Sequence, residues 1–216
     1  MKLPTDATLA LNQPTYFIAD IAANHDGSLE RALDLIKLAA EAGADAAKFQ
    51  NFRAETIVSR RGFKELGKKL THQASWEKDV FDVYHEAALP IDWTEALITE
   101  CEKNNIDYFT APYDIQYIDF FAPKMPYFKI GSGDITWKQS IERMASYGKP
   151  ILLATGASNI NEVEEAVSLI AKFRIPLILM QCNTNYTGRE DNFDYINLRT
   201  LETFKVKFPD VVLGLS

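Results

Sequence analysis

The residues best suited to chemistry lie in the stretch FKIGSGD, residues 128–134. Lys129 falls in a short apolar run, and Ser132, flanked by two glycines, is followed by Asp134. At the mouth of a parallel strand this set could hold a phosphate or carboxylate through the lysine charge, the serine hydroxyl and the amides that the glycines leave unshielded. An ordinary β-turn with one exposed lysine accounts for the same residues, so the rest of the chain has to decide.

Seven further polar residues follow or end short apolar runs, where parallel strands would deliver them to one edge of a sheet. They are Asp20 in YFIADIAA, Lys48 and Gln50 in AKFQ, Thr155 after ILLA, Thr184 and Tyr186 after LILMQC, and Ser216 after VVLGL. Together with residues 129–134 they suit a phosphorylated or carboxylated substrate beside a polyhydroxyl one.

Several of these positions have simpler explanations. A lysine that ends an apolar run has few structural reasons to be there, so we favour a functional role for Lys48. Asp20 fits a capped turn equally well, and Tyr186 fits simple packing. The Thr155–Gly156 turn is either plain geometry or a source of backbone amides for an anion. His25 most simply satisfies a turn.

Composition limits the remaining functions. The 216 residues fit one domain, and the net charge of -7 with a pI of about 5.1 argues against nucleic acid or an anionic membrane as partner. Cys101 and Cys182 lack metal-type spacing and fit reduced thiols. We find neither a signal peptide nor an apolar run of membrane-spanning length, and we expect a cytoplasmic protein.

Strand-like and helix-like segments alternate along the chain. The expected strands are 16–23, 44–49, 107–111, 127–130, 151–154, 177–182 and 211–215. The expected helices lie between Ser28 and Gly43 and over 93–104, 114–121, 136–147, 159–173 and 198–208. This alternation predicts a parallel sheet with helices outside it.

Units of this size, without a Gly-x-Gly-x-x-Gly after the first strand, favour a (β/α)8 TIM barrel over a dinucleotide-binding sheet. A complete barrel needs eight strands, so we expect a single barrel domain over residues 1–216 that is truncated after its seventh strand. Residues 51–89 are charged and weakly periodic, with a helix expected over 75–88. They predict an insertion that covers substrate, or else a solvated excursion on which His72 and His85 are surface residues.

An ordered set of motifs resembles one known family. The set is YFIADIAANHDGS, AGADAAKFQNF, KIGSGD, GKPILLATG, the segment 182–186 and VVLGLS. It covers nearly the whole chain and is similar to the N-acetylneuraminate (sialic acid) synthases, which include the legionaminic and pseudaminic acid synthases. The resemblance implies a (β/α)8 barrel that is usually followed by a small antifreeze-like domain, which we expect to be absent from residues 1–216.

The resemblance also implies roles for individual residues. Lys129 and Ser132 match residues that hold the phosphate of phosphoenolpyruvate, and Lys48 matches a lysine near its carboxylate. Asp20 and Asp134 stand where the family has glutamates. Gln50, Tyr186 and Ser216 match further substrate-contacting positions, and we also expect Thr155 and Thr184 to bind substrate.

Several positions depart from the family pattern. Ala154 replaces a phosphate-binding serine, Gln181 stands where histidine is common, and Thr184 stands where asparagine is expected. Thr187 replaces a proline. The two metal-binding histidines of the family would lie beyond residue 216, and His25 is not one of them.

The implied activity is the condensation of phosphoenolpyruvate with an N-acylated hexosamine, such as N-acetylmannosamine, to a nine-carbon 2-keto acid with release of phosphate. The resemblance implies a divalent metal, Mn or Mg, in the full-length enzyme and a homodimer, and we expect the 216-residue form to be inactive. A non-catalytic sugar- or anion-binding paralogue or fragment is the alternative. A relative that uses a phosphorylated sugar, such as a ketodeoxyoctonate-phosphate synthase, is the third hypothesis.

Overall fold

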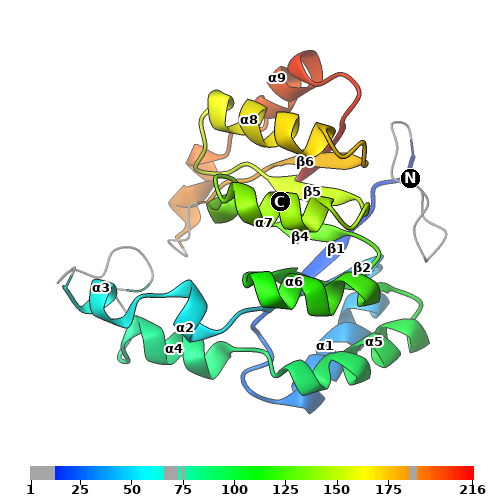
Figure 1. The fold of residues 1–216 in the computed structure, drawn as a ribbon. Coiled ribbons are helices and arrows are strands. Elements are labelled where there is room, and N and C mark those ends of the chain that lie inside the picture. The colour runs from blue at the N-terminus through cyan, green and yellow to red at the C-terminus, as the bar shows by residue number, and fades with distance from the viewer. Residues whose placement is uncertain (1–12, 66–72, 74–75, 185–188) are drawn as a thin grey trace. The chain divides into compact units, whose positions relative to one another are not determined.

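Strands and helices alternate along the chain in the computed structural model, which describes residues 13–65, 73, 76–184 and 189–216 (Figure 1). The chain forms two compact units, Met1–Pro126 and Tyr127–Ser216. Each unit has its own sheet, and the strand pairs in both sheets are parallel. The prediction of an α/β fold with parallel strands is therefore confirmed.

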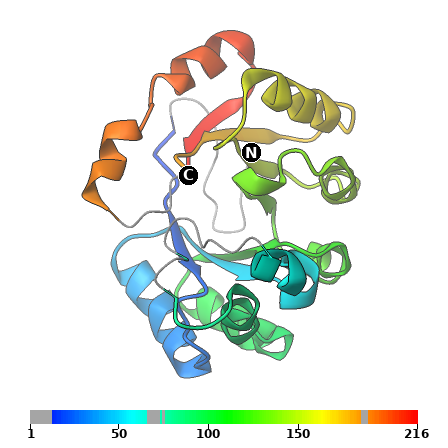
Figure 2. The ribbon, with the colours of Figure 1, turned by 90° about the vertical axis from the view of Figure 1, so that its left-hand side faces the viewer.

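The first unit contains a three-stranded sheet in the order β1-β2-β3. Its strands are β1 (Ile18–Ala22), β2 (Ala46–Asn51) and β3 (Asp107–Pro112). Its helices are α1 (Leu29–Glu41), α2 (Ala54–Ile57), α3 (Arg60–Glu65), α4 (Val80–Ala87), α5 (Thr94–Lys103) and α6 (Ile115–Phe121), with 3-10 turns η2 (Ile91–Trp93) and η3 (Ala122–Lys124). Helices α1 and α5 pack side by side against this sheet (Figure 2).

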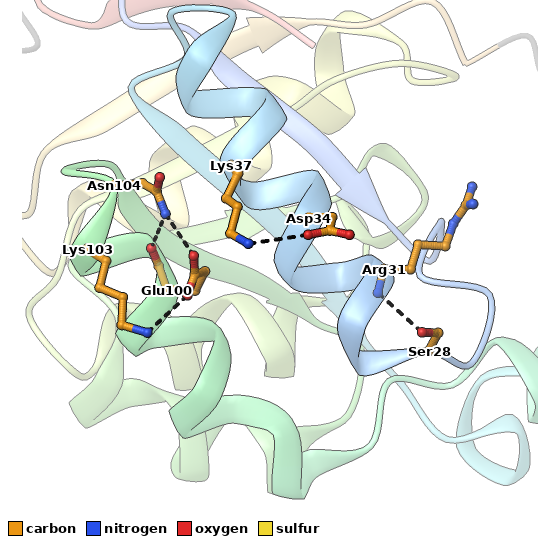
Figure 3. Close-up of polar contacts among 7 residues, drawn as sticks. All are labelled: Ser28, Arg31, Asp34, Lys37, Glu100, Lys103 and Asn104. Carbon is orange, nitrogen blue, oxygen red and sulfur yellow. Dashed lines mark hydrogen bonds and ion pairs between the residues drawn. The ribbon is translucent and has the colours of Figure 1, made fainter.

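Helix α1 begins and ends where its sequence predicts. The Ser28 hydroxyl accepts a hydrogen bond from the backbone N–H of Arg31 at 3.2 Å, which satisfies one amide of the first turn (Figure 3). Gly43 has a φ of 88°, a left-handed conformation that glycine adopts without steric cost and that ends the helix.

Ion pairs between residues three positions apart lie on α1 and α5 (Figure 3). Lys37 contacts Asp34 at 3.4 Å, and Lys103 contacts Glu100 at 3.2 Å. The side-chain amide of Asn104 donates to the Glu100 carbonyl at 2.8 Å, which closes the end of α5. The Lys37–Asp34 pair is exposed, whereas Glu100 is buried beneath Lys103. An exposed pair adds little stability.

The predicted insertion, residues 51–89, follows the carboxyl end of β2, and its described residues include the three short helices α2, α3 and α4. The helix expected over residues 75–88 is shorter than predicted: residues 76–79 are not helical, and α4 starts only at Val80. It ends at Ala87, and Ala88 is already extended, with a ψ of 129°.

The second unit contains a four-stranded sheet in the order β4-β5-β6-β7. Its strands are β4 (Phe128–Ile130), β5 (Ile151–Ala154), β6 (Leu177–Gln181) and β7 (Val212–Leu215). Its helices are α7 (Lys138–Ala145), α8 (Ile160–Ala171) and α9 (Thr200–Lys207), with 3-10 turns η4 (Ser132–Asp134) and η5 (Glu190–Tyr195). None of the helices in the described part of the chain is long and apolar enough to cross a membrane.

Helix α8 starts with a reciprocal cap. The Asn159 side chain accepts from the backbone N–H groups of Asn161 and Glu162, and the Glu162 carboxylate accepts from the Asn159 N–H at 2.8 Å. This capping box satisfies three amides at once. It fixes the start of α8 one residue inside the predicted range of 159–173.

Candidate functional site

The first cluster of predicted site residues joins β1 to β2. The strand register places Asp20 opposite Lys48, so their side chains leave the same face of the sheet. The Lys48 Nζ lies 2.7 Å from Asp20 Oδ1, with 8% of the lysine side chain and 59% of the aspartate side chain exposed. The structure thus brings these two residues together as an ion pair whose carboxylate faces water.

Gln50 lies two residues after Lys48 on β2 and therefore projects from the same face as Lys48. Its side chain is half-buried, so part of its amide remains accessible. Asp20, Lys48 and Gln50 offer, within one unit, a carboxylate, an ammonium group and an amide. Such a set can orient hydroxyl groups and attract one anionic group.

The second cluster surrounds β4, whose three residues are all buried. Lys129 is 6% exposed, and the register places it beside Leu152 of β5, an apolar neighbour. Its Nζ donates to the carbonyl oxygen of Ile130 at 3.3 Å. The ammonium group of Lys129 thus lies buried beside the end of β4.

Ser132 follows β4 and is held by the loop after β5. The backbone N–H of Gly156 donates to Ser132 Oγ at 3.0 Å. The expectation that the Thr155–Gly156 turn offers its amides to an anion is therefore wrong for the Gly156 amide, because the serine already accepts from it. The same bond orients the Ser132 hydroxyl, whose own proton remains available to donate to a substrate oxygen.

Thr155 connects the end of β5 to β6 through two hydrogen bonds. Its hydroxyl donates to the Met180 carbonyl of β6 at 2.9 Å, and its backbone N–H donates to the same oxygen at 3.0 Å. The side chain is buried. The hydroxyl proton is thus committed to the sheet, so any contact between Thr155 and a substrate would use the remaining lone pair of its oxygen.

Asp134 ends the 3-10 turn η4, two residues after Ser132. Burial raises the pKa of its carboxyl group to about 6. A carboxyl group with a pKa near neutrality is suited to both giving and taking protons. Asp134 is therefore the strongest acid–base candidate among the predicted site residues that the structure describes.

The remaining predicted residues lie after β6 and β7. Thr184 is half-buried, and its Oγ1 lies 3.8 Å from the sulfur of Cys182. Ser216 is exposed, and its N–H donates to the Gln181 carbonyl at 2.8 Å. Tyr186 and Thr187 lie outside the described residues.

The predicted site residues thus form two groups. Asp20, Lys48 and Gln50 belong to the first unit, and the residues from Lys129 onward belong to the second. The convergence of Lys48 and Lys129 on one rim stays a prediction.

Arg53, near the start of the insertion, forms a salt bridge with Asp114 that was not predicted from the sequence. Arg53 donates through Nε to Asp114 Oδ2 at 2.9 Å and through Nη2 to the same oxygen, and its guanidinium stacks on the Tyr117 ring at 5.5 Å. Burial alone would raise the pKa of Asp114, but hydrogen bonds from Arg53, from the Gln116 N–H and from Thr56 outweigh it and hold that pKa below its usual value. The only signal in the sequence was Asp114 at a helix start.

Two histidines have structural or surface positions. His25 is fully buried, its Nδ1 accepts from the Gly27 N–H at 3.1 Å, and its ring meets Trp93 edge-on at 5.6 Å. Burial lowers its pKa, so the ring is neutral at pH 7. His85 is exposed beside Glu55, as predicted, and His72 lies outside the described residues.

The cysteines differ in accessibility. Cys101 on α5 is buried, and burial raises the pKa of its thiol to about 12. Cys182 is half-buried at the end of β6. Neither lies in a group that could hold a metal: among the described residues no three His, Cys, Asp or Glu side chains are close enough to do so. The described residues therefore do not fit the metal that the resemblance implies, and no step below depends on one.

Comparison with known proteins identifies relatives over most of the chain. A profile described as the NeuB family matches residues 35–216. The N,N'-diacetyllegionaminic acid synthase of Campylobacter jejuni is 32% identical over 198 residues, covering 90% of this chain and 58% of that protein. The human N-acetylneuraminate-9-phosphate synthase is 28% identical over 204 residues, covering 94% of this chain and 55% of that protein. The chain therefore spans little more than half the length of these relatives.

A solved structure shares the fold. It is the sialic acid synthetase of Leptospira borgpetersenii in complex with citrate, with a TM-score of 0.79 and 28% sequence identity. The match covers 94% of this chain and 65% of that one. A truncated 3-deoxy-D-arabino-heptulosonate 7-phosphate synthase of Thermotoga maritima, at 12% identity and a TM-score of 0.54, is similar in fold alone.

Proposed function

Because the chain belongs to the NeuB family, we propose that it acts as a nonulosonic acid synthase, which condenses phosphoenolpyruvate with an N-acylated hexosamine and releases phosphate. The observation that carries the proposal is the group around β4, with its buried lysine, its oriented serine hydroxyl and its carboxyl group of raised pKa. These are the parts needed to bind a phosphate ester and move a proton beside it.

Anion binding falls to Lys129 and Ser132. The buried ammonium group would neutralise the phosphate, and the Ser132 hydroxyl, oriented by the Gly156 N–H, would donate to a phosphate oxygen. Lys48 would neutralise the carboxylate of the same substrate. Its ion pair with Asp20 holds the ammonium group in position until the substrate arrives.

The acylated sugar would be held by Asp20 and Gln50, with Thr184, Tyr186 and Ser216 as further contacts. The exposed carboxylate of Asp20 can accept from sugar hydroxyls while one of its oxygens stays on Lys48. Gln50 can donate and accept through its half-buried amide.

In the proposed reaction the C3 carbon of phosphoenolpyruvate forms a bond to the aldehyde carbon of the open-chain sugar. The electron pair of the C=O double bond moves to the sugar oxygen, which takes a proton. Water adds to the C2 carbon with loss of a proton. The bond from C2 to the phosphate oxygen then breaks, and the new C2 hydroxyl becomes the keto group as its proton passes to the departing phosphate. Asp134, with a pKa of about 6, exists in both protonation states near pH 7 and can give the proton that the sugar oxygen takes and take up the one that water loses.

We also propose that both sheets form part of one (β/α)8 barrel. Two observations support this: strand order equals chain order within each sheet, as in a barrel and unlike a doubly wound sheet. The structure of the Leptospira borgpetersenii protein is similar over nearly the whole chain.

The test measures binding and turnover separately. Calorimetry of the 216-residue chain with phosphoenolpyruvate should show binding that Lys129→Met and Ser132→Ala each weaken about tenfold or more. Lys207→Met, a surface change away from the cluster, is the control. Phosphate release is then followed with a panel of N-acylated hexosamines, with and without Mn, on this chain and on the product of its whole gene. Binding without turnover in every form would favour a non-catalytic binding protein.

A further inference from the structure

A cavity of about 350 Å³ lies in the second unit, between the carboxyl end of β6 and the helices α8 and α9. Thr155 and Gly156 also line it, so the cavity borders the group around β4 through the Gly156 N–H that donates to Ser132. Lys129 and Ser132 themselves are not among the lining residues. The register aligns Lys129 with Leu152 and Leu152 with Ile178, so these three side chains share one face of the sheet. Gln181, three residues after Ile178 on β6, projects from the opposite face, and it lines the cavity.

The lining is polar but uncharged. Among the described residues that line the cavity there is no acidic, basic or histidine side chain. Amides and hydroxyls come from Thr155, Ser158, Gln181, Asn183, Tyr195, Asn197, Thr200 and Thr203. The apolar part is formed by Val163 of α8 and Phe204 of α9, both of which are buried.

One polar atom beside this cavity lacks a partner. Gln181 is 5% exposed, and its Oε1 accepts no hydrogen bond from the described part of the chain. A buried acceptor left unpaired costs about 1–3 kcal/mol, and such atoms in folded proteins usually meet a water or a ligand. The atom requires a donor, an N–H or O–H group, rather than an anion.

The helix starts beside the cavity do not offer an anion site. The N–H groups of Asn161 and Glu162 are taken by the Asn159 side chain, and the Glu162 carboxylate adds negative charge there. At the start of α9 the Thr200 N–H is taken by the Asn197 carbonyl. An anion would therefore gain little at these helix starts.

We propose that this cavity is a second binding site, for a neutral N-acylated sugar, on the face of β6 opposite Lys129. The amide N–H of the ligand donates to Gln181 Oε1, its acyl methyl lies against Val163 and Phe204, and its hydroxyls meet the threonine and asparagine side chains. The volume is within the range of small-molecule sites. The proposal rests on Gln181, Val163 and Phe204, none of which is assigned to the synthase reaction; of the residues assigned to that reaction, Thr155 also lines the cavity.

The test follows the backbone and side-chain amide signals of the 216-residue chain by NMR during titration with N-acetylmannosamine. Saturable shifts are expected at the Gln181 side chain and at Thr203. Gln181→Met keeps the side-chain volume and removes the acceptor, and should weaken this binding about tenfold. Because it also removes an unpaired buried oxygen, it should not lower the melting temperature of the ligand-free protein.

The matched control is Gln50→Met, the same substitution on β2, which should leave the shifts at Gln181 and Thr203 unchanged. Thr203→Val is a second, exposed probe of the cavity should Gln181→Met fail to fold. The proposal is overturned by the absence of shifts at these residues, by affinity that survives both substitutions, or by equal binding of glucuronate, a sugar acid of similar size. Failure of the synthase reaction alone would leave these outcomes unaffected.

Discussion

Gly156 determines how closely three loops of the second unit approach one another. A Cβ at this position would lie 1.6 Å from Thr184 Oγ1, 2.9 Å from the Cys182 carbonyl oxygen and 3.0 Å from Ser132 Oγ. The glycine is needed for space and not for its backbone angles, because its φ is not in the left-handed region. The sequence shows a Thr-Gly turn but cannot show that the loop after β6 lies on it.

Gly156→Ala should therefore destabilise the protein by about 2–3 kcal/mol, as overpacking does in tight sites, measured by urea unfolding. Adding Thr184→Ala removes the nearest atom and should restore part of the loss, whereas Thr184→Val keeps the bulk and should restore none. Gly133→Ala is the control, since a Cβ there meets nothing within 4 Å. Equal stability of Gly156→Ala and Gly133→Ala would contradict this packing.

Asp134 links stability to pH. Its pKa is raised to about 6 in the folded state, so the folded protein binds this proton more tightly than the unfolded chain does. The contribution of this group to stability is thus greatest at low pH and is lost as the pH rises from about 4 to about 6. Asp134→Asn should abolish that slope and raise stability at pH 7.5 by about 2 kcal/mol.

The measurement is urea unfolding at a series of pH values between these limits, with Asp210→Asn, an exposed site, as the control. The same Asp134→Asn variant should lose phosphate release while retaining phosphoenolpyruvate binding, because the amide cannot exchange a proton. A variant that is more stable and fully active would remove Asp134 from the proposed proton transfer.

Element boundaries in this chain follow from local signals where the signals are strong. Ser28, Gly43 and Asn159 mark helix ends in the sequence, and the structure confirms each one. The helix boundaries after β2 could not be predicted in the same way, because α2, α3 and α4 are short and carry weak periodicity. The first helix of this region, α2, is positioned by the salt bridge between Arg53 and Asp114, which are 61 residues apart in sequence. No local sequence pattern predicts such a contact.

Asp114 both caps α6 and accepts from Arg53, so Asp114→Ala should cost about 1–3 kcal/mol at pH 7. Asp114→Asn retains a capping oxygen but loses the charge, so its stability should lie between that of the wild type and that of Asp114→Ala. Since the pKa of Asp114 is below its usual value, its contribution is present at neutral pH and is lost as the pH falls through the acid range. The gap between wild type and Asp114→Ala in urea midpoint should therefore narrow on acidification, and a constant gap would refute the charge contribution.

For the chain as a whole, the sequence predicted the alternating parallel architecture and the positions of Lys48 and Lys129 on strands, because apolar runs and turn residues are local features. It could not predict which polar atoms are already used within the fold. The Gly156 amide and the Thr155 hydroxyl have internal partners, and those partners come from strands and loops distant in sequence.

The proposal that Lys48 and Lys129 hold one substrate can be tested by a double-mutant cycle on phosphoenolpyruvate affinity with Lys48→Met and Lys129→Met. If both lysines hold one substrate, the effects should be non-additive by about 0.5–3 kcal/mol. Effects that add to within about 0.5 kcal/mol would mean that the two lysines act independently. The dissociation constants come from calorimetry at fixed ionic strength, because exposed charges are screened by salt.

Because Cys101 and Cys182 differ in burial, their rates of alkylation report on two different events. Cys101, enclosed on α5 with its pKa near 12, can be alkylated by a maleimide only when the first unit opens, so its labelling rate follows unfolding. Cys182 borders the cavity beside β6, and an occupant there would shield it. One mass-spectrometric time course can therefore follow ligand occupancy and global opening at the same time.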